Sequence, residues 1–225
     1  MKKIIPNALT AFNLVLGMFA IFSMLQQNFT MAALLIFSAL IADGLDGRVA
    51  RYYGASSEFG KELDSLCDLV SFGVAPALLA YLFLLHEFGI LGGLVAAAFA
   101  TCGALRLARF NVNTGVVKGY FMGLPIPTAG CVVSTFVMLG IKPSGWLFLI
   151  FVACFAYLMV STIRYPDFKG KGGEPVRTIP AAIALAVACY ILYMAPQGVL
   201  FAVFFGYSLF GVLNTLFGMF SHSPA

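Results

Sequence analysis

Residues Ile41–Asp68 read IADGLDGRVARYYGASSEFGKELDSLCD and lie between two strongly apolar stretches. This segment holds six of the nine acidic residues of the chain. Asp43 and Asp46 lie three residues apart at the end of the first apolar stretch. Asp64 and Asp68 lie four residues apart near the start of the second. Residues at these intervals share one face of a helix. The sequence therefore predicts two helices that each present a pair of carboxylates.

Four carboxylates gathered at the edge of a bilayer repel one another and lose hydration. One such charge at mid-membrane costs roughly 2.5–3.5 kcal/mol, so the cluster needs cations to balance it. Two divalent ions would neutralise it, and hard oxygen ligands suit Mg²⁺, Mn²⁺ or Ca²⁺. The alternative interpretation is that these acids only cap helix ends and form surface ion pairs. The cost of an intramembrane acid favours the metal hypothesis.

The fixed positions of this segment form a pattern with a defined spacing. They are Asp43-x-x-Asp46-Gly47-x-x-Ala50-Arg51, eight further residues, and Gly60-x-x-x-Asp64-x-x-x-Asp68. The pattern resembles the signature of the CDP-alcohol phosphatidyltransferase family at every fixed position. The resemblance implies a membrane enzyme that transfers a phosphatidyl-type group from a CDP-activated lipid to an alcohol and releases CMP. It also implies that the four aspartates bind two divalent cations, Mg²⁺ or Mn²⁺, and hold the pyrophosphate.

The same resemblance assigns further roles to single residues. Asp68 would deprotonate the acceptor hydroxyl in addition to binding metal. The CDP part of the lipid would be positioned by six residues: Asn13, Gly47, Ala50, Arg51, Ser57 and Gly60. Two of these have a second interpretation from the residues alone. Ser57 is placed to cap the helix that begins at Glu58, and Arg51 is either a fork for a phosphate or a basic flank of the membrane.

A polar face is also predicted on the first helix. Asn7, Thr10 and Asn13 recur every three residues in an otherwise apolar stretch. This face either lines a polar site or makes hydrogen bonds to neighbouring helices, which is common for such residues in membranes. The residues alone favour neither interpretation.

The composition fixes the broad class of the protein. The 225 residues are 61% hydrophobic and only 10% charged, and their mean hydropathy is +0.98. These values exclude a soluble domain of this length and indicate an integral membrane protein. The formal net charge of +4 is too small to suggest that nucleic acid is a partner. The five cysteines fall singly in apolar runs, so neither a disulfide framework nor a cysteine metal site is predicted.

Eight hydrophobic stretches approach the roughly 20 residues that a spanning helix needs. The sequence therefore predicts an all-α, polytopic membrane bundle that forms one transmembrane domain over residues 1–225. The predicted spans are Ala8–Leu25, Met31–Ala50, Phe59–Leu85, Ile90–Ala108, Phe121–Gly140, Gly145–Ile163, Thr178–Met194 and Val199–Phe220. The first could be mistaken for a signal peptide, but Asn13 interrupts it and no small-residue cleavage site follows, so we interpret it as a retained helix.

The basic residues predict the orientation of these spans. If the N-terminus lies inside, twelve of the thirteen fall on the cytoplasmic side and Lys142 alone lies outside, as the positive-inside rule requires. The twelve are Lys2, Lys3, Arg48, Arg51, Lys61, Arg106, Arg109, Lys118, Arg164, Lys169, Lys171 and Arg177. We therefore expect a multi-pass protein of the cell (inner or plasma) membrane whose active site faces the cytoplasm.

A second pair of motifs points to the acceptor. Arg106-Leu-Ala-Arg109-Phe-Asn is followed by Gly123-Leu-Pro-Ile-Pro127, and both runs resemble the phosphatidylserine synthase branch of the family. This resemblance implies L-serine as the acceptor, CDP-diacylglycerol or CDP-archaeol as the donor, and a homodimer among membrane lipids. Arg106 and Arg109 share a helical face, so we predict that they bind the acceptor, although both could be simple membrane anchors.

Two other functions are consistent with parts of the sequence. A sister enzyme with glycerol phosphate or inositol phosphate as acceptor would also use basic residues such as Arg106 and Arg109. A cation transporter would use intramembrane aspartates as its ion site. The transporter is disfavoured because the acids form one two-helix cluster and no inverted repeat is visible.

Overall fold

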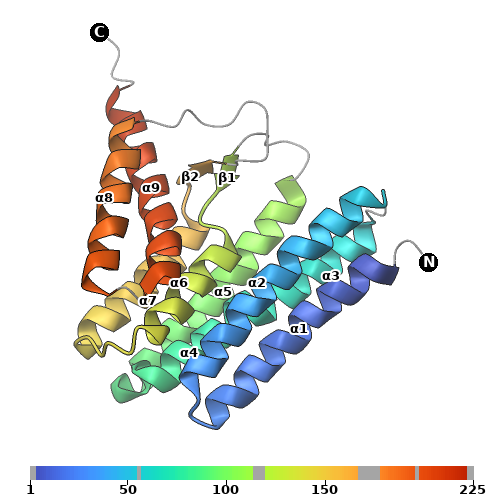
Figure 1. The fold of residues 1–225 in the computed structure, drawn as a ribbon, viewed down its shortest axis with the longest axis horizontal. Coiled ribbons are helices and arrows are strands. Elements are labelled where there is room, and N and C mark those ends of the chain that lie inside the picture. The colour runs from blue at the N-terminus through green and yellow to red at the C-terminus, as the bar shows by residue number, and fades with distance from the viewer. Residues whose placement is uncertain (1–3, 55–56, 114–119, 167–177, 196–197, 222–225) are drawn as a thin grey trace.

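The computed structural model describes residues 4–54, 57–113, 120–166, 178–195 and 198–221. In this part of the chain the protein is a bundle of long helices with one short two-stranded ribbon, so the predicted all-α membrane fold is confirmed (Figure 1). The ribbon was not predicted. The basic residues Lys2, Lys3, Lys118, Lys169, Lys171 and Arg177 lie outside the described residues.

The first two helices form an antiparallel hairpin. Helix α1 (Ile4–Leu25) and helix α2 (Phe29–Tyr52) pack along their lengths and are joined by a tight turn. The side chain of Asn28 caps α2 by accepting a hydrogen bond from the backbone N–H of Met31, 3.1 Å away. This hairpin brings the polar face of α1 against the acidic end of α2.

The third predicted span is one continuous helical segment whose geometry changes along its length. It consists of α3 (Glu58–Asp68), a π-helix η1 (Leu69–Val74) and α4 (Ala75–Phe83), which agrees closely with the predicted span Phe59–Leu85. The wide π turn was not predicted, and it begins directly after Asp68. Such turns are rare and are often found at functional sites.

Neighbouring helices approach the π-helix very closely. A β-carbon on Gly17 of α1 would collide with Ser71, and one on Gly130 would lie 2.6 Å from the carbonyl oxygen of Phe72. Ser71 Oγ also donates a hydrogen bond of 3.0 Å to the carbonyl of Asn13. The π-helix after Asp68 is therefore packed directly against the backbones of its neighbouring helices.

The ribbon connects the middle helices of the bundle. After the short 3₁₀ helix η2 (Leu85–Phe88) and helix α5 (Ile90–Asn113), strand β1 (Tyr120–Met122) pairs antiparallel with β2 (Arg164–Pro166). Gly123, at φ +78°, follows β1 and donates a backbone hydrogen bond of 2.8 Å to Ile163.

The ribbon shortens two of the predicted spans. Helix α6 (Ile126–Met138) begins only at Ile126, so the predicted start at Phe121 was wrong. Pro125 disfavours helical geometry in the residue before it, which explains the late start. Helix α7 (Gly145–Val160) ends before the predicted Ile163, because the chain becomes extended at Ser161 and enters β2.

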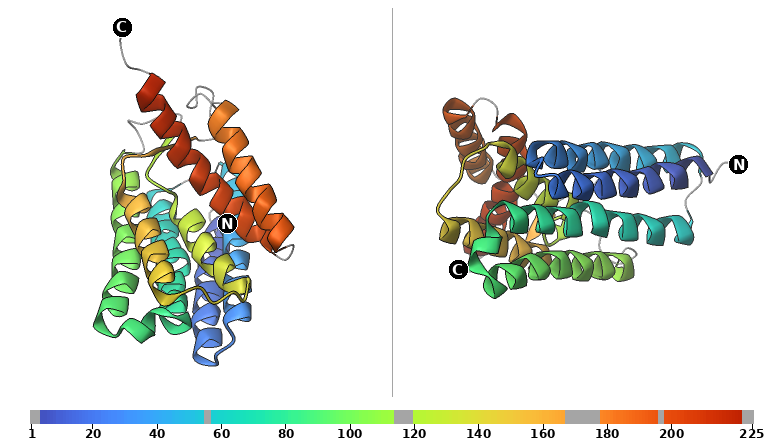
Figure 2. Two further views of the ribbon diagram at one scale, coloured as in Figure 1. Left: turned by 90° about the vertical axis from the view of Figure 1, so that its left-hand side faces the viewer. Right: turned by 90° about the horizontal axis from the view of Figure 1, so that it is seen from below.

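The last two helices pack against one another at one edge of the bundle (Figures 1 and 2). They are α8 (Thr178–Met194) and α9 (Val199–Ser221). Helix α9 also contacts α6 and strand β2. The hydroxyl of Thr215 hydrogen-bonds the backbone of Arg164 at 3.2 Å, which fixes the ribbon to α9.

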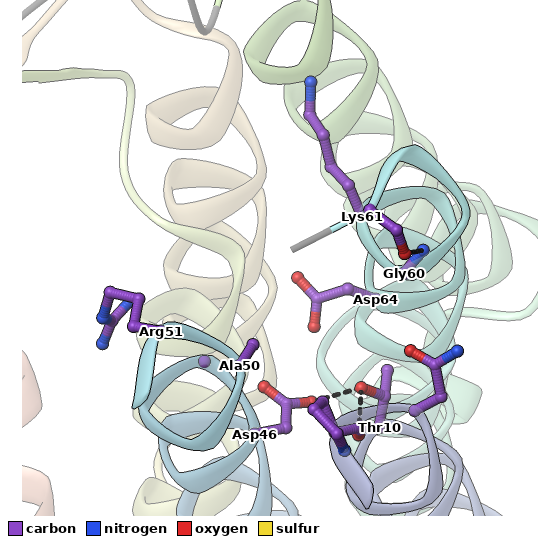
Figure 3. A pocket seen from close by; sticks show the side chains of 11 residues that line it. Thr10, Asp46, Ala50, Arg51, Gly60, Lys61 and Asp64 are labelled. Atoms are coloured by element: carbon purple, nitrogen blue, oxygen red, sulfur yellow. Dashed lines mark hydrogen bonds between the residues drawn. The ribbon is translucent and has the colours of Figure 1, made fainter. Parts of the chain in front are cut away.

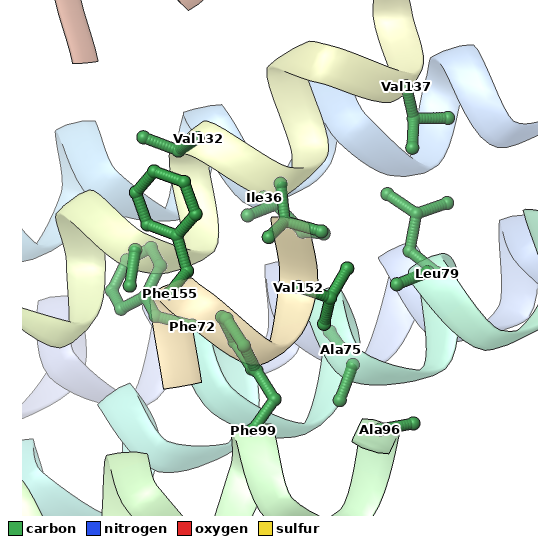
Figure 4. Packing of buried hydrophobic residues seen from close by; sticks show 14 of the residues in the cluster. Ile36, Phe72, Ala75, Leu79, Ala96, Phe99, Val132, Val137, Val152 and Phe155 are labelled. Carbon is green, nitrogen blue, oxygen red and sulfur yellow. The ribbon is translucent and has the colours of Figure 1, made fainter. Parts of the chain in front are cut away.

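The surfaces of the helices identify a multi-pass membrane protein. Five helices of the described part are long and apolar enough to cross a bilayer: Ile5–Leu25, Phe29–Tyr52, Glu58–Phe83, Ile90–Val112 and Val199–Gly218. Three further apolar helices are shorter: Ile126–Met138, Gly145–Val160 and Ile179–Met194. The interior is filled by residues such as Ile36, Phe72, Leu79 and Phe99 (Figure 4). Large apolar side chains also cover the outside, as expected for a lipid-facing surface.

Candidate active site

Three carboxylates from two helices meet at one point. Asp43 of α2 and Asp64 and Asp68 of α3 each offer an oxygen, and these atoms lie within 4.8 Å of one another. Like charges this close repel by about 3–4 kcal/mol per pair at an effective dielectric constant of 20. Asp64 Oδ1 is buried and has no hydrogen-bond partner among the described residues. A cluster of hard oxygen donors with an unpartnered atom fits a divalent cation, so these residues can bind a metal.

The fourth predicted ligand is placed differently. Asp46 lies outside this group of three, and its Oδ2 accepts a short hydrogen bond of 2.6 Å from Thr10 Oγ1. It faces the same region, because Asp46 and Asp64 line one pocket between α2 and α3 (Figure 3). The predicted role of Asp46 as a metal ligand stays a prediction.

The polar face of α1 contacts both acidic helices. Thr10 donates to Asp46 of α2, and Asn13 Nδ2 donates to Asp68 Oδ1 of α3 at 3.0 Å. Asn7 lies beside Gly60, where a β-carbon would come within 3.2 Å of Asn7 Oδ1. Each of the two sequence-based interpretations holds for part of this face: Thr10 and Asn13 make interhelical hydrogen bonds, and Asn7 and Thr10 line the pocket beside the carboxylates.

A pocket of about 250 Å³ opens beside the carboxylates. It contains five of the six residues predicted to contact the CDP-lipid, and Asn13 is the exception. Its lining consists of Pro6, Asn7, Thr10, Asp46, Gly47, Ala50, Arg51, Ser57, Gly60, Lys61 and Asp64 (Figure 3). The pocket therefore combines carboxylates, two basic side chains and exposed backbone at glycines, a mixture suited to a phosphate-bearing ligand with bound cations.

The start of α3 is fixed by a cap. Ser57 Oγ accepts a hydrogen bond from the backbone N–H of Gly60 at 3.1 Å, so the predicted capping role of Ser57 is confirmed. Gly60 has no side chain to crowd this cap, since a β-carbon there would lie only 3.2 Å from Ser57 Oγ. The cap holds the first turn of α3 at the mouth of the pocket.

Lys61 is a pocket residue that sequence reasoning treated only as a basic flank. Its Nζ donates a hydrogen bond of 3.0 Å to the backbone carbonyl of Asn111, near the end of α5. The side chain of Asn111 in turn donates to Ser65 Oγ at 2.9 Å. The signal that could have identified Lys61 is its position three residues before Asp64, on the same helical face.

The two arginines of α5 have different surroundings. Arg106 is only 7% exposed, its guanidinium lies 5.0 Å from the centre of the Phe110 ring, and it is close enough to interact electrostatically with Asp68. Its Nε has no hydrogen-bond partner among the described residues. Arg109 instead donates from Nη2 to the carbonyl of Val160 at 2.7 Å, where α7 ends. Arg106 is therefore the one with an unpartnered donor near the carboxylates.

The far side of Arg106 is built from the C-terminal part of the chain. Tyr207 of α9 interacts electrostatically with Arg106 and packs on Tyr165, with 5.8 Å between ring centres. Tyr165 is fully buried and its hydroxyl has no partner among the described residues. Burial and the nearby Tyr207 raise the pKa of the Tyr165 phenol above its usual value, so this phenol stays protonated.

Comparisons with known proteins identify relatives that match most of the chain. The sequence model described as CDP-alcohol phosphatidyltransferase matches residues 3–163. A CDP-diacylglycerol–serine O-phosphatidyltransferase of Helicobacter pylori is 41% identical over 222 residues, covering 95% of this chain and 92% of that protein. One of Bacillus subtilis is 41% identical over 76% of this chain and 94% of its own length. An archaetidylserine synthase of Methanothermobacter thermautotrophicus is 39% identical over 76% of this chain and 72% of its own.

Proposed function

The chain belongs to the CDP-alcohol phosphatidyltransferase family, and from that premise we propose that it transfers a phosphatidyl group from a CDP-activated lipid to L-serine. The products are CMP and phosphatidylserine. The observation that carries this proposal is the group of three carboxylates, contributed by α2 and α3, beside a polar pocket. The names of its relatives support serine as the acceptor and either CDP-diacylglycerol or CDP-archaeol as the donor.

Different pocket residues would bind different parts of the CDP-lipid donor. Arg51 offers a planar fork of donors to a phosphate oxygen, while Gly47, Ala50 and Gly60 let the nucleotide approach the backbone closely. Asp43, Asp46, Asp64 and Asp68 would hold two divalent cations, Mg²⁺ or Mn²⁺. When bound, such ions neutralise the pyrophosphate and the charge that develops as CMP leaves.

Asp68 is the proposed general base. It lies one helical turn after Asp64, at the end of α3, and its side chain is only 6% exposed. There it takes the proton of the serine hydroxyl as the oxygen attacks the phosphorus that bears the lipid. Arg106, which interacts electrostatically with Asp68, would bind the carboxylate of the same serine molecule.

The test of this function is the release of CMP from CDP-diacylglycerol by the purified protein in detergent with Mg²⁺. Serine, glycerol phosphate and inositol phosphate are supplied in turn as the acceptor. We expect rapid release only with serine. Release with a phosphorylated acceptor and none with serine would identify a sister enzyme. No release with any acceptor would contradict the proposed reaction class.

We further propose that the site faces the cytoplasm and that the protein is a homodimer embedded among membrane lipids. The N-terminal end of α1, the C-terminal end of α2, the start of α3 and the end of α5 lie on one side of the bundle (Figure 1). The described basic residues Arg48, Arg51, Lys61, Arg106 and Arg109 belong to the parts of α2, α3 and α5 near these ends, and Arg164 begins strand β2. Lys142 instead lies in the α6–α7 connection. This asymmetry supports a cytoplasmic site.

Cysteine labelling tests this orientation. In a variant whose five native cysteines are replaced by serine, Lys142→Cys should react with an impermeant maleimide in intact cells. Tyr52→Cys, at a position that is 84% exposed at the end of α2, should react only after the cells are permeabilised. The reverse pattern would place the active site outside.

A second prediction concerns Arg106. Arg106→Ala should raise the serine concentration needed for half-maximal rate by about tenfold or more, because a hydrogen bond to a charged group is worth about 1.5–3 kcal/mol. The requirement for CDP-lipid should change much less. Arg48→Ala, which removes an exposed arginine of α2, is the matched control and should change neither. An equal rise for both substrates would show that Arg106 does not act on the acceptor.

A further inference from the structure

A side chain of α1 is bonded directly to the proposed base. Asn13 is fully buried, and its Nδ2 donates a hydrogen bond of 3.0 Å to Asp68 Oδ1. A carboxylate can only accept, so the amide nitrogen must face Asp68 and the amide oxygen must point away. That oxygen, Asn13 Oδ1, is buried and has no partner among the described residues.

Such an amide is costly to keep in the middle of a bundle. An unpartnered buried carbonyl lowers stability, and an apolar side chain of similar size would avoid this penalty. Nor does Asn13 line the donor pocket, where the sequence-based prediction placed it. The bond to Asp68 is therefore the contact of Asn13 that needs a functional reason.

The hydrogen bond from Asn13 restricts the terminal side-chain torsion of Asp68. The terminal torsion of an aspartate side chain has a broad distribution, so packing alone sets its orientation poorly. The position of Asn13 is itself fixed, because its carbonyl accepts a 3.0 Å hydrogen bond from Ser71, in the π-helix that follows Asp68. One turn earlier, Thr10 holds Asp46 of α2 in a similar way. Helix α1 thus orients one carboxylate on each acidic helix.

We propose that Asn13 is a positioning residue for Asp68. By occupying Oδ1, its amide fixes the carboxylate relative to Asp43 and Asp64 and leaves Oδ2 to take the proton of the acceptor hydroxyl. This inference rests on the proposed role of Asp68 as the base. It assigns Asn13 a role different from the predicted contact with the nucleotide.

A double-mutant cycle tests the inference at saturating Mg²⁺ and serine. The variants are Asn13→Leu, Asp68→Asn and the combination, with Asn13→Ala as a second replacement that relieves any crowding. Turnover, CDP-lipid affinity and melting temperature are measured for each. Alone, Asn13→Leu should lower turnover by about 10–100-fold, the usual effect of losing an outer partner of a functional carboxylate. CDP-lipid affinity should stay at the wild-type value.

Repeating the Asn13 substitution in the Asp68→Asn protein distinguishes a positioning role of Asn13 from a purely structural one. In Asp68→Asn, removing Asn13 should cause no further loss, because two residues that act as one unit are not additive. Thr10→Val is the matched contrast on the same face of α1. It should weaken CDP-lipid binding more than turnover, because Thr10 lines the donor pocket and holds Asp46.

Each contrary result has a distinct meaning. Lost CDP-lipid affinity in Asn13→Leu that matches the lost rate would return Asn13 to the nucleotide site and overturn the inference. The same loss in both backgrounds would make Asn13 a structural residue only. A slow Asp68→Asn with a fully active Asn13→Leu would overturn this inference and leave the proposed function intact. A fully active Asp68→Asn would remove the proposed base and the inference together.

Discussion

Replacing Asp64 by asparagine is expected to abolish turnover and weaken the binding of divalent cations. Asp64 is one of three carboxylates within 4.8 Å of one another, and its buried Oδ1 has no partner among the described residues. The amide keeps the size of the side chain but removes its negative charge. Metal assistance is worth several kcal/mol in such reactions, so the rate should fall by about 10³-fold or more. Asp43→Asn should behave in the same way.

The measurement combines CMP release with titration of Mn²⁺, whose binding is followed by electron paramagnetic resonance without any substrate. Glu58→Gln is the matched control, because it removes one negative charge from the exposed first turn of the same helix. It should keep both activity and Mn²⁺ binding. Undiminished turnover of the wild-type protein after chelation of all divalent cations would show that the carboxylates serve some other purpose.

Replacing Asp68 by asparagine is expected to separate binding from turnover. The amide cannot accept the proton, so turnover should fall by about 10²–10⁴-fold, the usual contribution of general base catalysis. CDP-lipid affinity should change far less, since the other carboxylates and the pocket residue Arg51 remain in place.

The affinity and the rate of CMP release are measured side by side for this variant. Loss of affinity equal to the loss of rate would make Asp68 a metal ligand with no role in proton transfer. A variant that binds donor and metal normally but releases CMP slowly would support its role as the base. Because Asn13 and Arg106 both interact with Asp68, this variant also sets the reference for their effects.

The acidic site could be predicted from sequence because its geometry is mostly local. The spacing of Asp64 and Asp68 places them on one helical face in any α-helix, and Asp43 lies in the C-terminal half of the preceding helix. The cost of several acids in an apolar chain then indicates a metal site. The pocket followed for the same reason, since most of its residues lie within the Asp43–Asp68 segment.

Features that depend on distant parts of the chain could not be predicted. The ribbon is one of them, because β1 pairs with β2, more than forty residues further along the chain. The capping of α7 by Arg109 and the bond from Lys61 to Asn111 depend on how α5 packs against its neighbours. The π-helix was missed because its residues, Leu69–Val74, are as apolar as those of an ordinary span.

The close packing around that π-helix limits which residues can replace its neighbours during evolution. Gly17 and Gly130 lie outside the donor pocket, yet each leaves no room for a side chain against the turn that follows Asp68. A larger residue at either position would displace the turn that follows Asp68, although neither glycine lines the donor pocket. Selection for phospholipid synthesis therefore also acts on positions inside the helix bundle, where glycine is required because there is no room for a side chain.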